Sequence, residues 1–246
     1  MKNITMATKY NLLDTSELNK DFSLYRQGRT DYLLTRELPV ILEKHDRSKR
    51  ILDYGCGAGL STRFLKSLGL NVVGVDISKA VLDLARKNDL NGHYLQINEQ
   101  NDLPFNKSEF KIVVSTFVLF AIPTLNEIIA VFKRINRVLD KDGVFIAVTG
   151  STEMYKRDWL SLEVKQFPQN NNPKSGDACK IKLTEVDLVL EDYFWTDEDY
   201  EQVAKQSNFV IANKTYPLGK DEDGIAWKDE KKFPPYVFYE FKKTGV

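Results

Sequence analysis

Residues 51–59 read ILDYGCGAG, an apolar run with one acid that leads into three alternating glycines. Glycines at this spacing let the chain bend sharply and approach a ligand closely, because no Cβ obstructs either movement. Apolar residues then recur at the spacing of a helix, at Leu60, Phe64, Leu65 and Leu68. The stretch predicts a strand, a tight turn and a helix whose free N–H groups face a ligand.

The positions of the glycines separate two kinds of nucleotide-binding turn. A dinucleotide-binding turn, Gly-x-Gly-x-x-Gly, would require glycine where this chain has Leu60. The run instead resembles motif I of the class I S-adenosylmethionine-dependent methyltransferases, which has an acid two residues before the first glycine. The resemblance implies that Asp53 lies near the ammonium group of the cofactor and that Gly55 and Gly57 pass beneath it. A glycine turn that serves only packing is the competing interpretation.

A second acid ends the next predicted strand. Residues 71–76 are mainly apolar and finish at Asp76, and Ser78 is a good N-cap for the helix that follows. An acid at this place can accept hydrogen bonds from both hydroxyls of a ribose, in dehydrogenases and methyltransferases alike. Asp76, with Ile77 after it, therefore predicts a nucleoside site without choosing the cofactor. A solvated Asp at the start of a loop is the alternative.

A third predicted strand, residues 93–97, leads into NEQNDLPF at residues 98–105. This run resembles the family's Gly-Asp-Ala-x-x-Leu-Pro-Phe, and the resemblance implies that Glu99 accepts a hydrogen bond from the adenine amino group, with Gln100 beside it. Three acids after three successive strands favour one adenosyl cofactor, S-adenosylmethionine, over a chance arrangement.

The fourth predicted strand covers residues 111–116. At its end, the resemblance implies that residues 115–119 border the sulfonium and the methyl acceptor. We expect Thr116 to contact the cofactor. Many relatives carry a histidine soon afterwards, whereas this chain has Phe120-Ala121. A histidine base at this position is therefore not expected.

The order of predicted strands and helices indicates an α/β protein with a Rossmann-like, doubly wound sheet of seven strands. By resemblance the last strand is antiparallel and belongs to a closing hairpin. We expect four segments: an N-terminal helical lid (1–46) in which Pro39 kinks or breaks the helix, a cofactor-binding core (47–149), an insertion after the fifth strand that forms a substrate lid (150–195), and a C-terminal helix with the closing hairpin (196–246).

The N-terminal segment resembles the lid of small-molecule N- and O-methyltransferases. In that lid a tyrosine covers the cofactor and an arginine reaches its carboxylate, which would be Tyr25 and Arg29 here. A tyrosine ring is attracted to a sulfonium by a cation–π contact. An amphipathic helix that packs its aromatic residues on the sheet is an equally good interpretation.

The insertion carries a group of aromatic residues that could form an acceptor pocket: Tyr155, Trp159, Tyr193 and Trp195. Ordinary core packing explains them equally well. Residues 180–190 alternate in polarity, which predicts a strand or hairpin. No residue is an obvious base, and Tyr25 and Tyr193 are the catalytic candidates, for proton handling only.

The composition limits which partners and which cellular location we expect. The chain has 246 residues, 42% of them hydrophobic, with 35 basic and 35 acidic side chains, so the net charge indicates no nucleic-acid partner. We find no run long enough for a membrane helix, no signal peptide and no cluster of metal ligands, and we expect a cytoplasmic protein.

These observations predict methyl transfer from S-adenosylmethionine to a nitrogen or oxygen of a small molecule, which is the partner we expect. A regulatory protein that binds an adenosyl ligand without catalysis remains open. A nicotinamide-dependent oxidoreductase is disfavoured by Leu60 and by the closing hairpin.

Overall fold

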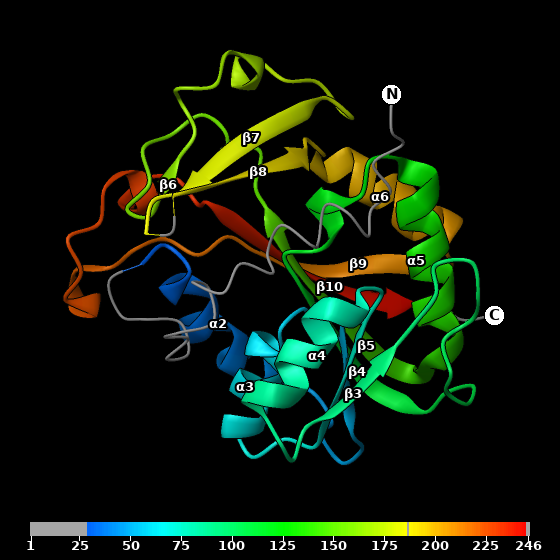
Figure 1. The fold of residues 1–246 in the computed structure, drawn as a ribbon. Helices are drawn as coiled ribbons and strands as arrows, with labels where there is room; N and C mark the ends of the chain where they lie inside the picture. Colours follow the sequence, from blue (N-terminus) through cyan, green and yellow to red (C-terminus); the bar gives the residue numbers. More distant parts are fainter. Residues whose placement is uncertain (1–28, 186, 245–246) are drawn as a thin grey trace.

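The computed structural model describes residues 29–185 and 187–244, and within them a seven-stranded sheet forms the centre of the molecule (Figure 1). The strand order is β3-β2-β1-β4-β5-β10-β9. The bounds of these strands are β1 Ile51–Tyr54, β2 Val72–Asp76, β3 His93–Gln96, β4 Phe110–Thr116, β5 Leu139–Gly150, β9 Phe209–Thr215 and β10 Tyr236–Lys243. Strands β1 to β5 pair in parallel, and β10 pairs antiparallel with both β5 and β9. The predicted fold class is confirmed, including the antiparallel last strand.

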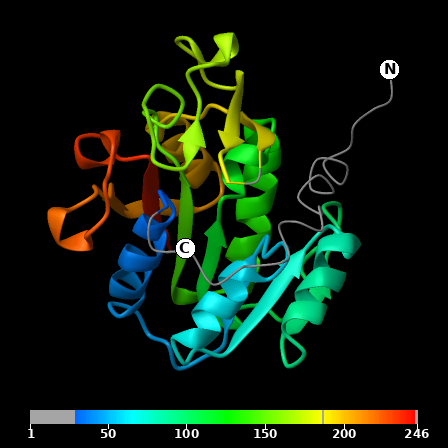
Figure 2. The same ribbon diagram turned by 60° about the vertical axis from the view of Figure 1, so that its left-hand side comes forward.

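Helices cover both faces of this sheet (Figure 2). The helices are α2 Tyr32–Leu42, α3 Leu60–Ser67, α4 Lys79–Asn88, α5 Leu125–Val138 and α6 Asp197–Gln206. Alternate residues of the parallel strands enter two separate cores, with α2 and α3 on one side and α5 and α6 on the other. A parallel sheet buried on both faces places its loops, and hence its ligands, at the carboxyl ends of the strands.

The segment after β5 folds into a second, three-stranded sheet in the order β6-β7-β8 (Figure 1). Its strands are β6 Leu162–Glu163, β7 Ala178–Leu183 and β8 Leu188–Tyr193. The antiparallel pair of β7 and β8 agrees with the alternation in the sequence. The insertion predicted after the fifth strand is thus present, and it begins at the carboxyl end of β5.

The remaining turns are short 3-10 helices: η2 Leu119–Ala121, η3 Pro168–Asn170, η4 Asp221–Asp223 and η5 Asp229–Lys231. No helix in residues 29–185 and 187–244 is long and apolar enough to cross a membrane.

Two local predictions differ from the structure. Helix α2 does not break at Pro39 but continues to Leu42, because Leu34, Leu38 and Ile41 are held in the core on one side of the sheet. The apolar run at residues 144–149 predicts a fifth strand over those residues, but β5 begins five residues earlier, at Leu139. Leu139 pairs with Phe110 across an irregularity in the β4–β5 ladder.

Candidate cofactor site

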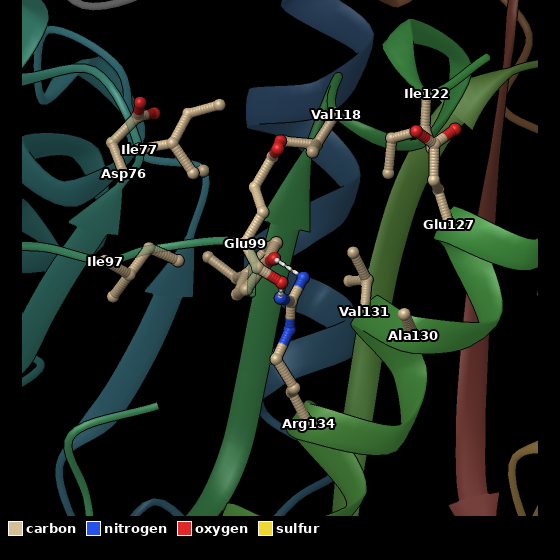
Figure 3. A pocket seen from close by; sticks show the side chains of 12 residues that line it. Asp76, Ile77, Ile97, Glu99, Val118, Ile122, Glu127, Ala130, Val131 and Arg134 are labelled. Atoms are coloured by element: carbon tan, nitrogen blue, oxygen red, sulfur yellow. Dashed lines mark hydrogen bonds between the residues drawn. The ribbon is translucent and has the colours of Figure 1, made fainter. Parts of the chain in front are cut away.

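A cleft lies at the carboxyl ends of β1, β2 and β4, against helix α5 (Figure 3). It encloses about 590 Å³ of empty space, part of it open to solvent. Its lining residues are Tyr54, Gly55, Asp76, Ile77, Ile97, Glu99, Val118, Ile122, Glu127, Ala130, Val131 and Arg134.

The glycine turn after β1 forms one edge of this cleft. Gly55 has φ +77°, and a Cβ there would lie 2.3 Å from Cγ2 of Val118. Gly57 has φ +52°, and a Cβ on it would meet no atom within 4 Å. The left-handed backbone and the contact with Val118 explain why glycine is needed at Gly55. The open space at Gly57 leaves room for a ligand that passes close to the backbone.

Asp76 links the end of β2 to this turn. One carboxylate oxygen, Oδ2, accepts a hydrogen bond from the Gly57 N–H at 2.9 Å, and Oδ1 accepts one from the Ser78 N–H at 2.9 Å. Burial raises the pKa of Asp76, and the backbone N–H groups oppose that effect. The carboxylate can still accept from a further donor, because its two oxygens together accept about four hydrogen bonds. Asp76 and Ile77 both line the cleft.

Asp53 lies beneath the turn, is fully buried and does not line the cleft. Its Oδ2 accepts hydrogen bonds from the hydroxyls of Ser61 and Thr62, both at 2.6 Å, and its Oδ1 has no hydrogen-bond partner in the described part of the chain. Burial raises the pKa of Asp53 to about 6. An unpaired oxygen on a buried carboxyl is costly, so it fits a site that a bound cation completes.

The other predicted cofactor residues are divided between the cleft and its surroundings. Glu99 lines the cleft from the loop after β3. Gln100 is exposed beside it, and its backbone N–H donates to the Asn98 side chain at 2.8 Å. Thr116, at the end of β4, is buried but does not line the cleft.

Of the two predicted lid residues the structure describes only Arg29, which does not line the cleft. Arg29 donates to Asp31 at 3.1 Å and to Glu185 at 2.7 Å, and so joins the start of α2 to the insertion. Tyr25 lies outside the described residues.

The four aromatic residues of the insertion occupy two different environments. Tyr155 and Trp159 are buried in the core that contains α2 and α3, where the Trp159 indole N–H donates to the Met154 carbonyl at 2.6 Å. The structure therefore places these two in the packing of the insertion and not on the wall of the cleft. A sequence offers no signal that distinguishes an aromatic residue in a core from one on a pocket wall.

Tyr193 and Trp195, by contrast, connect the insertion to the cleft. The Trp195 indole N–H donates at 3.2 Å to the carbonyl of Ile122, a residue of the cleft wall. Burial, and then the charges of Glu191 and Glu127, raise the pKa of Tyr193. Tyr193 packs against the core that contains Ile122 and the buried face of α5, although it does not itself line the cleft.

Helix α5 forms a whole wall that the sequence analysis did not anticipate. Glu127, Ala130, Val131 and Arg134 recur at helical spacing and line the cleft together (Figure 3). One sequence signal could have indicated this face of α5: the polar residues Glu127 and Arg134 lie seven positions apart, with the small Ala130 between them.

Strand β4 ends in a strained residue. Phe117 has φ +60°, which is unusual for a bulky side chain, and its N–H donates to the Val148 carbonyl at 2.8 Å. Its ring lies 4.9 Å from that of Tyr236 and 6.1 Å from that of Phe120, measured between centroids. Such strain costs about 1–3 kcal/mol and tends to occur where a side chain is held for function.

The sheet order, the glycine turn and an acid-lined cleft at the carboxyl ends define a Rossmann-like protein that binds a nucleoside ligand. The open space at Gly57 fits a cofactor that lies across the turn, above the buried Asp53.

Comparisons with known proteins identify the family. A family model described as a methyltransferase domain matches residues 52–147. N-demethylindolmycin N-methyltransferase from Streptomyces griseus is 28% identical over 187 residues, which cover 71% of this chain and 75% of that protein. The 18S rRNA (guanine-N(7))-methyltransferase of Bos taurus is 34% identical over 80 residues, only 32% of this chain and 28% of the relative. The structure of the CcbJ methyltransferase from Streptomyces caelestis shares the fold, with a TM-score of 0.65 at 14% identity over 97% of this chain and 99% of that one.

The chain belongs to the class I S-adenosylmethionine-dependent methyltransferases, and S-adenosylmethionine is its cofactor.

Proposed function

We propose that this enzyme transfers the methyl group of S-adenosylmethionine to a nitrogen or oxygen of a small molecule. One observation supports the proposal most directly. Asp76 and Glu99 line the same cleft as Ile122, and the Ile122 carbonyl accepts the hydrogen bond by which Trp195 attaches the insertion to the cleft wall. A segment of about 45 residues at this place would cover the acceptor side of the cleft, as a substrate lid does.

We place the nucleoside of the cofactor at the β2 and β3 side of the cleft. Asp76 would accept the ribose hydroxyls, Ile77 would pack against the base, and Glu99 would accept from the adenine amino group, with Gln100 beside it. These positions are supported by the lining of the cleft by Asp76, Ile77 and Glu99.

The methionine part of the cofactor would lie over the glycine turn. Gly55 and Gly57 would pass beneath it, Asp53 would attract its ammonium group from below, and Thr116 would border it from β4. In the N-terminal segment Tyr25 would cover the sulfonium. Arg29 would reach the carboxylate of the cofactor only by exchanging its hydrogen bonds to Asp31 and Glu185, which are the contacts present in the structure.

We place the acceptor between the strained Phe117 and the end of β8. Tyr193 and Trp195 would bound it, and Tyr193 is the candidate for proton handling, with Tyr25 as the other. Tyr155 and Trp159 would support this wall from the core behind it. The segment 150–195 would then act as the substrate lid, together with the N-terminal segment 1–46.

The cofactor supplies a methyl group that is already activated by its sulfonium. The chain's residues therefore have to hold the acceptor in line with the methyl group and exclude water, effects of proximity that can contribute several kcal/mol. A general base is optional when the acceptor is a free amine.

Production of S-adenosylhomocysteine tests this proposal. The purified enzyme is incubated with cofactor and a panel of small amines, phenols and carboxylic acids, with total RNA as a separate arm because one relative is named for methylation of rRNA. Turnover with a small molecule and none with RNA supports the proposal. Turnover only with RNA contradicts the choice of acceptor, and cofactor binding without any turnover favours the regulatory alternative.

Trp195→Phe provides a sharper test of the acceptor side. It keeps the ring and removes the indole N–H that docks the insertion on the cleft wall. We expect the KM for the acceptor to rise severalfold while the affinity for the cofactor stays unchanged. An unchanged KM would separate the insertion from acceptor binding.

A further inference from the structure

Arg134 projects from α5 across the cleft and joins two elements that carry cofactor residues (Figure 3). One guanidinium nitrogen, Nη1, donates to the backbone carbonyl of Glu99, in the loop after β3. The other, Nη2, donates at 3.2 Å to the hydroxyl of Tyr54, at the end of β1. The side chain therefore bridges the loop after β3 to the strand that precedes the glycine turn.

The contact with Glu99 is made to its backbone and not to its carboxylate. In the described part of the chain the Glu99 carboxylate has no ion pair or hydrogen bond, and it points into the same cleft as Arg134 (Figure 3). An arginine that held the carboxylate itself would compete with a ligand. By holding the carbonyl, Arg134 fixes the loop and leaves the carboxylate free to accept from a base.

The arginine is not an ordinary surface side chain. Its Nε is buried and has no hydrogen-bond partner among the described residues. A buried unpaired donor destabilises a protein, and more so on a charged group. The neighbouring Lys133, by contrast, is exposed on the same helix.

We propose that Arg134 is a positioning residue for the cofactor: it sets the place of Glu99 relative to β1 and so determines how the adenine end of the cleft recognises its base. The inference rests on the placement of adenine at Glu99 given above. Arg134 acts through Glu99, so its contribution to binding depends on the presence of the Glu99 carboxylate.

A double-mutant cycle measures that dependence. Binding of S-adenosylhomocysteine is measured by calorimetry for Arg134→Met, Glu99→Ala, the double variant and the matched control Lys133→Met, which removes a positive charge from the exposed face of α5. We expect each of the first two substitutions to weaken binding roughly tenfold, and Lys133→Met to leave it unchanged. In the Glu99→Ala background, Arg134→Met should weaken binding by no more than about twofold. The kcat at saturating cofactor should change little, because the loss is in binding.

The outcomes separate this inference from the proposed function. If Arg134→Met binds as the wild type does, or weakens binding equally with and without Glu99, Arg134 is not positioning Glu99. If Glu99→Ala alone changes nothing, the placement of adenine fails first, and the role of Arg134 fails with it. Should Arg134→Met not fold, Tyr54→Phe removes one anchor of the bridge, and affinity equal to that of the wild type would then overturn the inference.

Discussion

Asp76→Ala tests the placement of the ribose most simply. Asp76 is 3% exposed at the end of β2, and its two oxygens hold the N–H groups of Gly57 and Ser78. The substitution removes the acceptor of both proposed ribose hydrogen bonds, and it also frees the N–H that fixes the glycine turn.

The expected loss follows from these contacts. A hydrogen bond to a charged acceptor contributes about 1.5–3 kcal/mol. Burial disfavours the charged form of Asp76, as its raised pKa shows, so part of that gain is offset before the ligand binds. We therefore expect a loss of about 1–3 kcal/mol in cofactor binding, which corresponds to a rise of roughly 5–150-fold in Kd.

Calorimetric titration with S-adenosylhomocysteine gives the affinity, and thermal unfolding of the free protein shows how much of the effect is structural. Asp83→Ala is the matched control, because Asp83 is exposed on α4 and, among the residues that the structure describes, forms ion pairs with the surface cations Lys79 and Arg86 alone. The control should bind normally. An Asp76→Ala protein that folds and binds with unchanged affinity would refute the placement of the ribose.

Three further predictions concern the glycine turn and two buried carboxyl groups. Gly57→Ala and Gly69→Ala both place a Cβ in open space at positive φ, so thermal melts should show that each lowers the free energy of unfolding by about 1 kcal/mol. Calorimetry should show weaker cofactor binding for Gly57→Ala alone. Equal affinities of the two variants would show that the cofactor does not lie over the glycine turn. Burial raises the pKa of Asp53 from 3.8, its ordinary value, to about 6 in the folded protein. The neutral carboxyl therefore contributes its full stability below pH 3.8, and this contribution is lost as the pH rises through about 6. Denaturant unfolding should therefore show the wild type losing about 1 kcal/mol relative to Asp53→Asn between about pH 5 and about pH 7.5, and parallel pH profiles would contradict this. Glu230 is fully buried and accepts hydrogen bonds from one hydroxyl and two backbone N–H groups. Glu230→Ala should therefore lower the free energy of unfolding by about 3 kcal/mol or more. A loss below about 1 kcal/mol would show that the three donors find other partners.

The sequence predicts the parts of the site that depend on short-range patterns. The glycine turn follows β1, Asp76 ends β2 and Glu99 lies three residues after β3. Parallel strands bring their carboxyl ends to the same edge of a sheet. The topology and these residues could therefore be predicted together.

Contacts between distant segments could not be predicted in the same way. Arg134 meets Glu99 across 35 residues, and Arg29 meets Glu185 across 156. Neither pair leaves a periodic pattern in the sequence, because each depends on how helices and loops are docked on the sheet. The buried Tyr155 and Trp159 illustrate the same limit, since their environment is decided by the packing of the insertion against α2 and α3.

A crystal structure with S-adenosylhomocysteine bound tests the central claim most directly. The account predicts that both ribose hydroxyls lie within hydrogen-bond distance of the Asp76 carboxylate and that the adenine amino group donates to Glu99, in the cleft against α5. A ligand bound elsewhere, or one held in this cleft with Asp76 turned away from its ribose, would contradict it.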